Sequence, residues 1–229
     1  MRDITIIAPH PDDEFLGCRQ LLKDYGERIH SVLFVTNGEL QTTIIDEPLV
    51  QYVLTRRTES ENYLNKISTD KRRGNIFSLC LNVPDSLNYD FLNEGFYADS
   101  FHRHHRLTPH MYLYKDIAKY SNKILAFPAD QKHPTHKLVF DVCKKLVDLQ
   151  EKEFILYNVP ALKRGLEFFK GQVYSEEFGT LKEELQTPSD KMKEFAEFYP
   201  SQLKRLAKSW PDMKMTERYL YNCNLPNWE

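Results

Sequence analysis

The sequence predicts an α/β protein with a Rossmann-like, mostly parallel sheet, helices on both faces of that sheet, and an irregular helical part at the C-terminus. Short apolar runs alternate with segments of helical periodicity over the first two thirds of the chain, as in βαβ units. Glycine and proline are scattered, so no obvious linker divides the chain. We therefore expect one domain over residues 1–229, a length that buries a sizeable core.

Five short apolar runs predict the strands of the sheet. Ile4–Ala8 comes first and is β-branched, as buried parallel strands tend to be. The runs that follow it are Ile29–Val35, Ile76–Val83, Lys123–Phe127 and Phe154–Val159. Asn37 and Gly38 mark a turn after the second run.

Six segments between and after these runs carry apolar residues at helical spacing, which predicts a helix in each of the six. The expected helices are Glu14–Tyr25, Val50–Ile67, Met111–Tyr120, Pro134–Leu149, Thr187–Tyr199 and Ser201–Ser209. The last two belong to a C-terminal part of helices and tail at 187–229. Residues 85–110 show neither periodicity, and because long loops in compact domains are often functional, we interpret them as a variable substrate loop.

Composition and charge argue against several classes of function. The 31 basic and 33 acidic side chains give a net charge of −2, so no global positive field attracts nucleic acid. The N-terminal apolar run stops at Ala8, too early for a signal peptide, and no stretch reaches the roughly 20 apolar residues of a membrane span. We expect a cytoplasmic protein without a membrane span. Its four cysteines, which form no CxxC pair, are expected to be reduced, buried thiols.

Two segments concentrate histidine and carboxylate side chains, and each directly follows a predicted strand. The first holds His10, Asp12, Asp13 and Glu14, and the second holds Asp130, His133 and His136. Ligands of open α/β sheets bind at the carboxyl ends of the strands, so we expect both segments at one rim. Each contains a proline that stiffens the turn.

Such a rim could hold a catalytic metal ion. Imidazole and carboxylate groups are suitable ligands for Zn²⁺, and three protein ligands plus water make an open catalytic site. Asp12 would then be left over to accept a proton from the activated water. In a second interpretation, Asp12, Asp13 and Glu14 only satisfy free N–H groups at a helix start. The repetition of the pattern at a second strand end favours the metal site.

The chain resembles the PIG-L/LmbE family of zinc-dependent N-deacetylases, which are N-acetylglucosaminyl deacetylase-like enzymes. The resemblance rests on APHPDDE at residues 8–14 and HPTH at residues 133–136. Weaker matches are TNGE at residues 36–39, Arg56 with Glu59, and Tyr199-x-Ser201-Gln202 after Lys191. Together these segments span most of the chain.

This resemblance implies a role for each matching residue. His10, Asp13 and His136 would bind Zn²⁺, or another divalent metal such as Fe²⁺. Asp12 would be the general base, and His133 would stabilise the oxyanion and help to protonate the leaving amine. The implied reaction is the hydrolysis of an N-acetyl, or another N-acyl, group on an amino sugar or glycoconjugate.

The remaining site predictions are weaker. Asp130 would hydrogen-bond the imidazole of His133 and keep it protonated. The predicted substrate contacts are Arg56, Glu59, Glu14, Asn37 and His104. Arg56 and Glu59 would alternatively form a local helical ion pair worth about 0.2–0.5 kcal/mol. The histidine-rich stretch at residues 102–110 is interpreted as a solvated loop, with an anion site or a second metal site as the alternatives.

Three other classes of protein compete with the hydrolase. A nucleotide-binding Rossmann protein needs a GxGxxG turn, which the sequence lacks. A Mg²⁺-dependent phosphotransfer domain would use the paired aspartates, but the histidines favour a borderline metal. A non-catalytic carbohydrate-binding protein of the same fold would have lost a ligand or the base.

The expected partner is a small molecule or glycan with an N-acetylated amino sugar. The sequence leaves open whether the chain forms a homo-oligomer.

Overall fold

Within the described residues, the sheet has seven strands in the order β3-β2-β1-β4-β5-β7-β6. The structure, a computed structural model, describes residues 2–38, 48–70, 75–83, 109–129, 133–159, 180–184, 188–206 and 217–225. The strands are β1 (Ile4–Ala8), β2 (Ile29–Phe34), β3 (Phe77–Cys80), β4 (Ile124–Pro128), β5 (Glu153–Tyr157), β6 (Thr180–Glu184) and β7 (Glu217–Tyr221). The five strands from β3 to β5 in the sheet order are parallel, which confirms the predicted class.

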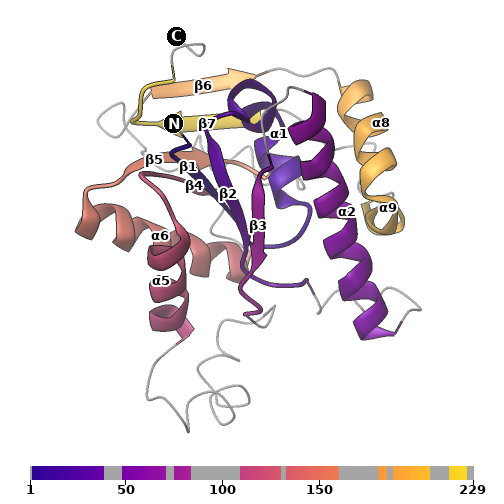
Figure 1. Cartoon of the computed structure of the whole chain (residues 1–229), viewed down its shortest axis with the longest axis horizontal. Helices are drawn as coiled ribbons and strands as arrows, with labels where there is room; N and C mark the ends of the chain where they lie inside the picture. The colour runs from indigo at the N-terminus through magenta and orange to yellow at the C-terminus, as the bar shows by residue number, and fades with distance from the viewer. Residues whose placement is uncertain are drawn as a thin grey trace, which may run out of the picture.

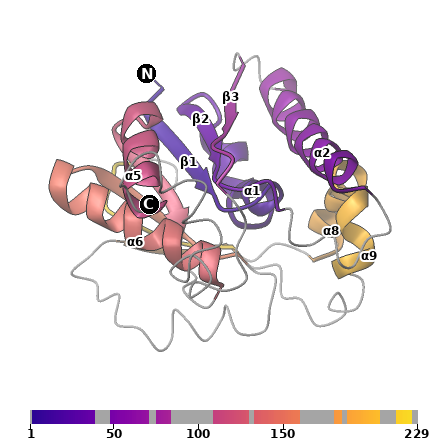
Figure 2. The same cartoon turned by 90° about the horizontal axis from the view of Figure 1, so that it is seen from below.

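Helices cover both faces of this sheet, as Figures 1 and 2 show. Their bounds are α1 (Asp13–Tyr25), α2 (Leu49–Asp70), α5 (Pro109–Tyr120), α6 (Pro134–Gln150), α8 (Pro188–Phe198) and α9 (Pro200–Leu206). Alternate residues of β1 point to opposite faces: Ile4 and Ile6 join the core under α1, α2 and α8, whereas Ile7 joins the core under α5 and α6. Each face of the sheet therefore has its own apolar core.

The connections that follow β1 and β4 run in opposite directions at the carboxyl end of the sheet. From β1 the chain passes through α1 to β2 on one side, and from β4 it passes through α6 to β5 on the other. The strand order reverses between these two neighbours, which is where α/β sheets bind ligands. The first turns of α1 and α6 meet at this point, which brings His133 and His136 beside His10 and Asp13.

The C-terminal prediction was incomplete. The segment at 187–229 was expected to hold only helices and tail, but it also contributes β7, which pairs antiparallel with β5. β6 was also missed, and it pairs antiparallel with β7 at the edge of the sheet. The sequence of β6, TLKEE, lacks the apolar run by which the other strands were predicted. Residues 85–108 of the predicted substrate loop lie outside the described residues.

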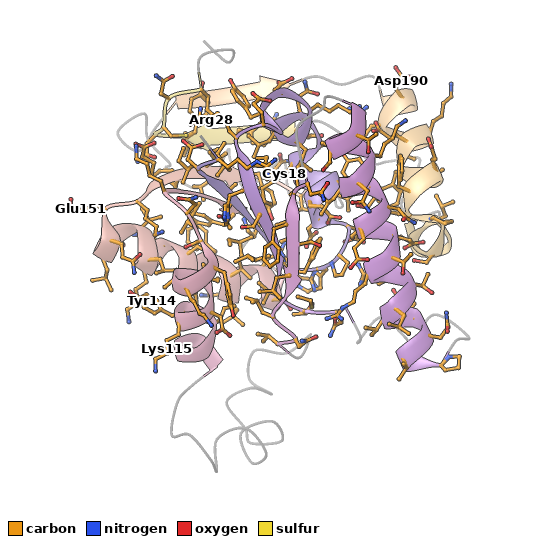
Figure 3. The ribbon with its side chains drawn as sticks, viewed as in Figure 1. Cys18, Arg28, Tyr114, Lys115, Glu151 and Asp190 are labelled. Carbon is orange, nitrogen blue, oxygen red and sulfur yellow. The ribbon has the colours of Figure 1, made fainter. Side chains whose placement is uncertain are left out.

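The four cysteines are free, as expected. Cys18, Cys143 and Cys223 are buried, and Cys80 is partly buried. Figure 3 shows Cys18 inside the molecule, whereas charged residues such as Glu151 and Asp190 lie at its periphery. No helix in the described part of the chain is both long and apolar enough to cross a bilayer.

A buried ion pair joins α8 to β7, and its two residues also bond α1. Lys191 of α8 pairs with Glu217 of β7, and both side chains are fully buried. The Lys191 ammonium also donates to the carbonyl of Leu16 in α1 (2.8 Å). Glu217 accepts from the Gln20 backbone N–H (2.9 Å) and from the Tyr219 hydroxyl. Burial lowers the pKa of Lys191, and the neighbouring Glu217 opposes that shift.

Replacing Lys191 with methionine is expected to lower the free energy of unfolding by about 3–5 kcal/mol, because Glu217 then stays buried without its cation. Urea unfolding of the metal-free protein measures this change. The double variant Lys191→Met/Glu217→Gln is the control, and it should recover part of the loss because no uncompensated charge remains. A loss below 1 kcal/mol in the single variant, on the scale of an exposed pair, would contradict the prediction.

Candidate metal centre

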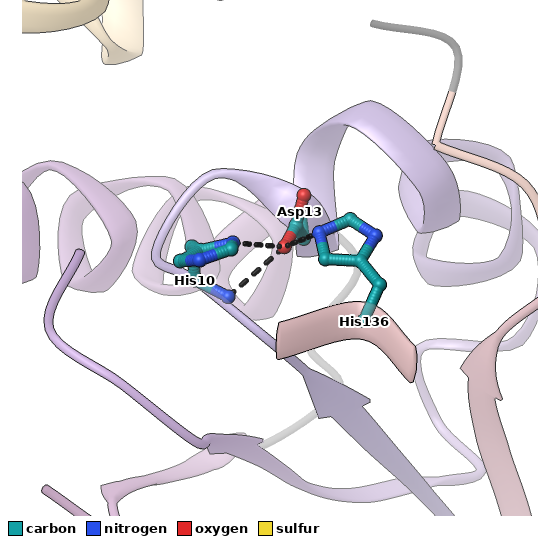
Figure 4. Close-up of side chains that lie close together, drawn as sticks. All are labelled: His10, Asp13 and His136. Atoms are coloured by element: carbon teal, nitrogen blue, oxygen red, sulfur yellow. Dashed lines mark hydrogen bonds and ion pairs between the residues drawn. The ribbon is translucent and has the colours of Figure 1, made fainter. Parts of the chain in front are cut away.

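His10, Asp13 and His136 converge at the carboxyl end of β1 (Figure 4). Each offers one ligand atom, and these three atoms lie within 4.8 Å of one another. The carboxylate oxygen Oδ2 of Asp13 is 3.1 Å from Nδ1 of His10 and 3.3 Å from Nε2 of His136. His10 and His136 are only 4 % and 5 % exposed. Among the described residues, these three form the one group of histidine, cysteine and carboxylate side chains that could hold a metal ion.

Local structure fixes the three side chains. Residues 9–12 turn from β1 into α1, and the Asp13 N–H closes this turn on the His10 carbonyl (3.2 Å). The His10 N–H in turn donates to the Asp13 carboxylate (2.9 Å). His136 lies in the first turn of α6, which begins at Pro134 in the N1 position that favours proline. These contacts orient the side chains of the cluster toward one another.

The donor set fits a tetrahedral divalent metal. Zn²⁺ bonds of about 2.0–2.1 Å to nitrogen and oxygen imply ligand atoms about 3.3 Å apart, close to the two distances from Asp13, while the whole set lies within 4.8 Å. Burial by itself raises the pKa of Asp13, but His136 and His10 outweigh it and hold that pKa well below the ordinary value. An ionised carboxylate between two imidazoles suits Zn²⁺ or Fe²⁺ better than Mg²⁺.

His133 completes a ring of imidazoles around this point. Its ring centroid lies 5.0 Å from that of His10 and 4.9 Å from that of His136. It is the N-cap residue of α6 and is partly exposed, whereas the three candidate ligands are buried. A partly exposed imidazole next to the cluster can reach a molecule bound there. Asp130, its predicted partner, lies outside the described residues, as does His104.

Asp12 lies beside the cluster and is held by a buried cation. Nη2 of Arg56 is 2.9 Å from the Asp12 carboxylate, and the same guanidinium donates to the Pro11 carbonyl. It also reaches the Gly38 carbonyl (3.5 Å). Arg56 is 1 % exposed, so its position favours support of Asp12 over direct substrate contact.

The site requires a glycine at Gly38, and sequence reasoning found this only in part. The sequence predicted a turn there but did not show which side chain packs against the glycine. Its φ of 68° belongs to the left-handed region, and a Cβ there would overlap the Arg56 guanidinium. The one available signal was the placement of glycine directly after Asn37.

The Gly38→Ala variant is expected to lose about 1–3 kcal/mol of unfolding free energy, through backbone strain and displacement of Arg56. Urea unfolding measures the loss. Gly26→Ala is the matched control, because Gly26 has an ordinary helical φ of −55° that alanine adopts readily. Equal stability of the Gly38→Ala variant and the unmodified protein would show that Arg56 does not need this space.

The other predicted substrate contacts bind the protein itself. Glu59 accepts from the Ser201 N–H (2.7 Å) and from its hydroxyl (2.5 Å), which ties α2 to α9. Burial raises the pKa of Glu59, and the Ser201 hydrogen bonds oppose this. Asn37 accepts from Arg57 (2.9 Å) and donates to Asn82 (3.2 Å). Their substrate contacts stay predictions, and the geometry favours supporting roles.

Glu14 is fully buried. Its two carboxylate oxygens accept from the Asp12 N–H (2.8 Å) and from the Tyr199 hydroxyl (2.5 Å). Burial raises the pKa of Glu14 to about 7, and the Tyr199 hydrogen bond opposes that shift. The side chain thus faces the interior and joins the first cluster to the C-terminal helices.

A family model described as GlcNAc-PI de-N-acetylase, PIG-L, matches residues 5–147, which include both histidine clusters. No curated protein sequence matches the chain significantly. The remaining comparisons are with solved structures.

Solved structures of other proteins resemble nearly the whole chain, and three deacetylases are among them. An antimicrobial A40926 pseudoaglycone deacetylase has a TM-score of 0.62 at 14% identity, covering 97% of this chain and 99% of its own. The zinc inhibited form of a teicoplanin deacetylase has a TM-score of 0.55 at 15% identity, with coverages of 95% and 97%. N,N'-diacetylchitobiose deacetylase from Pyrococcus horikoshii has a TM-score of 0.53 at 16% identity, with coverages of 96% and 84%. At these identities the likeness establishes the fold alone.

Proposed function

We propose that this chain, which belongs to the PIG-L family of GlcNAc-PI de-N-acetylases, is a metal-dependent hydrolase. The reaction is the removal of an N-acetyl, or another N-acyl, group from an amino sugar or glycoconjugate. The observation that carries the proposal is the convergence of His10, Asp13 and His136 on one point, with Asp12 and His133 beside it. Names of solved relatives add support, since they include deacetylases of a glycopeptide and of an acetylated disaccharide.

The ligands in this proposal are His10, Asp13 and His136, and the metal is Zn²⁺, with Fe²⁺ as the alternative. A divalent ion held there would polarise the acyl carbonyl and activate a water molecule. Two imidazoles and one carboxylate are three protein ligands, the number that would leave a coordination position for that chemistry.

The remaining steps belong to side chains of the protein. Asp12 accepts the proton of the attacking water, and Arg56 keeps its carboxylate in one orientation. His133 donates a hydrogen bond to the oxyanion and then a proton to the leaving nitrogen. A carbon–oxygen bond forms, the amide carbon–nitrogen bond breaks, and acetate and a free amine are released.

The test is acetate release from a panel of N-acetylated amino sugars. The panel contains N-acetylglucosaminyl phosphatidylinositol, N,N'-diacetylchitobiose and an N-acetylated glycopeptide, each assayed with added Zn²⁺, with Fe²⁺ under anaerobic conditions, and with a chelator. We expect acetate from at least one compound, loss of release with the chelator, and recovery when metal is restored. Release that persists after complete metal removal, or binding of these sugars without any turnover, would overturn the proposal and favour a carbohydrate-binding role.

A further inference from the structure

Asp12 has an unusual backbone conformation for its residue type. Its φ of 116° and ψ of −24° lie on the left-handed side, where residues other than glycine are strained. It is the N-cap residue of α1, yet its carboxylate makes no capping hydrogen bond. The carboxylate instead meets Arg56. Something other than helix capping must hold this backbone in place.

Glu14 supplies one part of that hold. Its carboxylate accepts the Asp12 N–H at 2.8 Å, so a side chain at the second helical position (N2) bonds the backbone of the N-cap residue, as the N3 side chain does in a capping box. The Glu14 side chain is 0 % exposed, so this contact is made away from solvent. One oxygen of Glu14 therefore serves the backbone of Asp12 and leaves the Asp12 carboxylate for Arg56.

Tyr199 supplies the other part, from far along the chain. Its hydroxyl donates to the second oxygen of Glu14 at 2.5 Å, across a sequence separation of 185 residues. The Tyr199 ring is stacked on Phe195 at 5.0 Å and meets Phe15 edge-on at 5.5 Å. Tyr199 is 1 % exposed and lies between α8 and α9. This packing fixes the hydroxyl, and through it the Glu14 carboxylate.

We propose that Glu14 and Tyr199 are positioning residues that hold Asp12 in its left-handed conformation and so aim its carboxylate. The C-terminal helices then act on the site through one chain of hydrogen bonds, although the family match ends at residue 147. The inference rests on the proposed function only in giving Asp12 the role of proton acceptor.

Three variants test the proposal. Glu14→Ala removes both contacts and should lower kcat by at least about tenfold, the cost of one hydrogen bond to a charged group, with KM and bound metal unchanged. Glu14→Gln should stay close to the unmodified protein, because its amide oxygen still accepts from Asp12 and its amide nitrogen can donate to the Tyr199 oxygen. Tyr199→Phe should lower kcat by a smaller factor of the same kind.

Tyr52→Phe is the matched control. It also removes a buried tyrosine hydroxyl that bonds the C-terminal helices, since the Tyr52 hydroxyl accepts from Gln202 at 3.1 Å. It leaves the Glu14 hydrogen bonds in place, so kcat should not change. An equal loss of kcat in Tyr52→Phe and Tyr199→Phe would overturn the proposal, because general loosening of α8 and α9 would then explain both.

Hydrogen exchange of the Asp12 amide in metal-free protein gives a readout that needs no activity. We expect exchange to accelerate by at least about tenfold in Glu14→Ala, to a lesser degree in Tyr199→Phe, and not in Glu14→Gln. Unchanged exchange and unchanged kcat in Glu14→Ala would overturn the positioning role. Should the Asp12→Asn variant keep full activity, the proton-acceptor role of Asp12 would fail, and the exchange rates would still decide whether Glu14 and Tyr199 hold the Asp12 backbone.

Discussion

The Asp12→Asn variant is expected to keep its metal and lose turnover by about 100- to 10,000-fold, the usual contribution of a general base. Asp12 is adjacent to Asp13 in the chain but is outside the His10, Asp13 and His136 group, so the ligand set is intact. Asparagine also keeps an oxygen toward Arg56, which limits the cost of leaving that guanidinium buried without its anion. The measurement is kcat on the compound found in the acetate screen, together with metal content per chain.

Asp3→Asn is the matched control for this prediction. Asp3 also pairs with an arginine, Arg28, at 2.8 Å, but it lies before the first residue of β1, at the opposite end of the strand from the cluster. It should lose some stability and no activity. Full activity of the Asp12→Asn variant, with normal metal content, would remove Asp12 from the reaction.

Local pattern was sufficient to predict the parallel strands and the pair of histidine segments. Buried parallel strands need apolar side chains on both faces, so β1 appears in the sequence as the run Ile4–Ala8. The rule that ligands bind at the carboxyl ends of such strands then predicted the meeting of His10 and His136, which are 126 residues apart by their numbers (136 minus 10). That part of the site follows from topology, and topology follows from the alternation of strands and helices.

Contacts that depend on distant packing were not predictable in the same way. The spacing of Arg56 and Glu59 favoured a shared helical face, but nothing in α2 indicates that Arg56 turns toward Asp12 while Glu59 binds Ser201. β7 was missed for a related reason: its side chains fit a strand only because β5 and β6 flank it. The sequence therefore predicted the clustering of His10, Asp13 and His136 better than the residues that support this cluster.

The His136→Ala variant is expected to lose metal binding, because it removes one of the three side chains that converge on the site. Loss of an outer partner alone costs about 10- to 100-fold in metal affinity, and loss of a ligand should cost more. Competition with a chromogenic chelator for Zn²⁺ measures the affinity directly. The midpoint of thermal unfolding gives an independent measure, since a ligand at about 100 times its Kd stabilises the native state by about 2.7 kcal/mol. Added Zn²⁺ should raise that midpoint in the unmodified protein and leave it unchanged in the variant.

His30→Ala is the control that separates loss of a ligand from loss of any histidine. His30 is partly buried in β2, where its ring contacts the Ser31 hydroxyl (3.1 Å), and it lies near the start of that strand, away from the carboxyl ends where the cluster forms. Its variant should bind Zn²⁺ as the unmodified protein does. Unchanged Zn²⁺ affinity in the His136→Ala protein would mean that His136 and Asp13 form only an ordinary buried hydrogen bond. The proposed hydrolase would then have to bind its metal elsewhere or work without one.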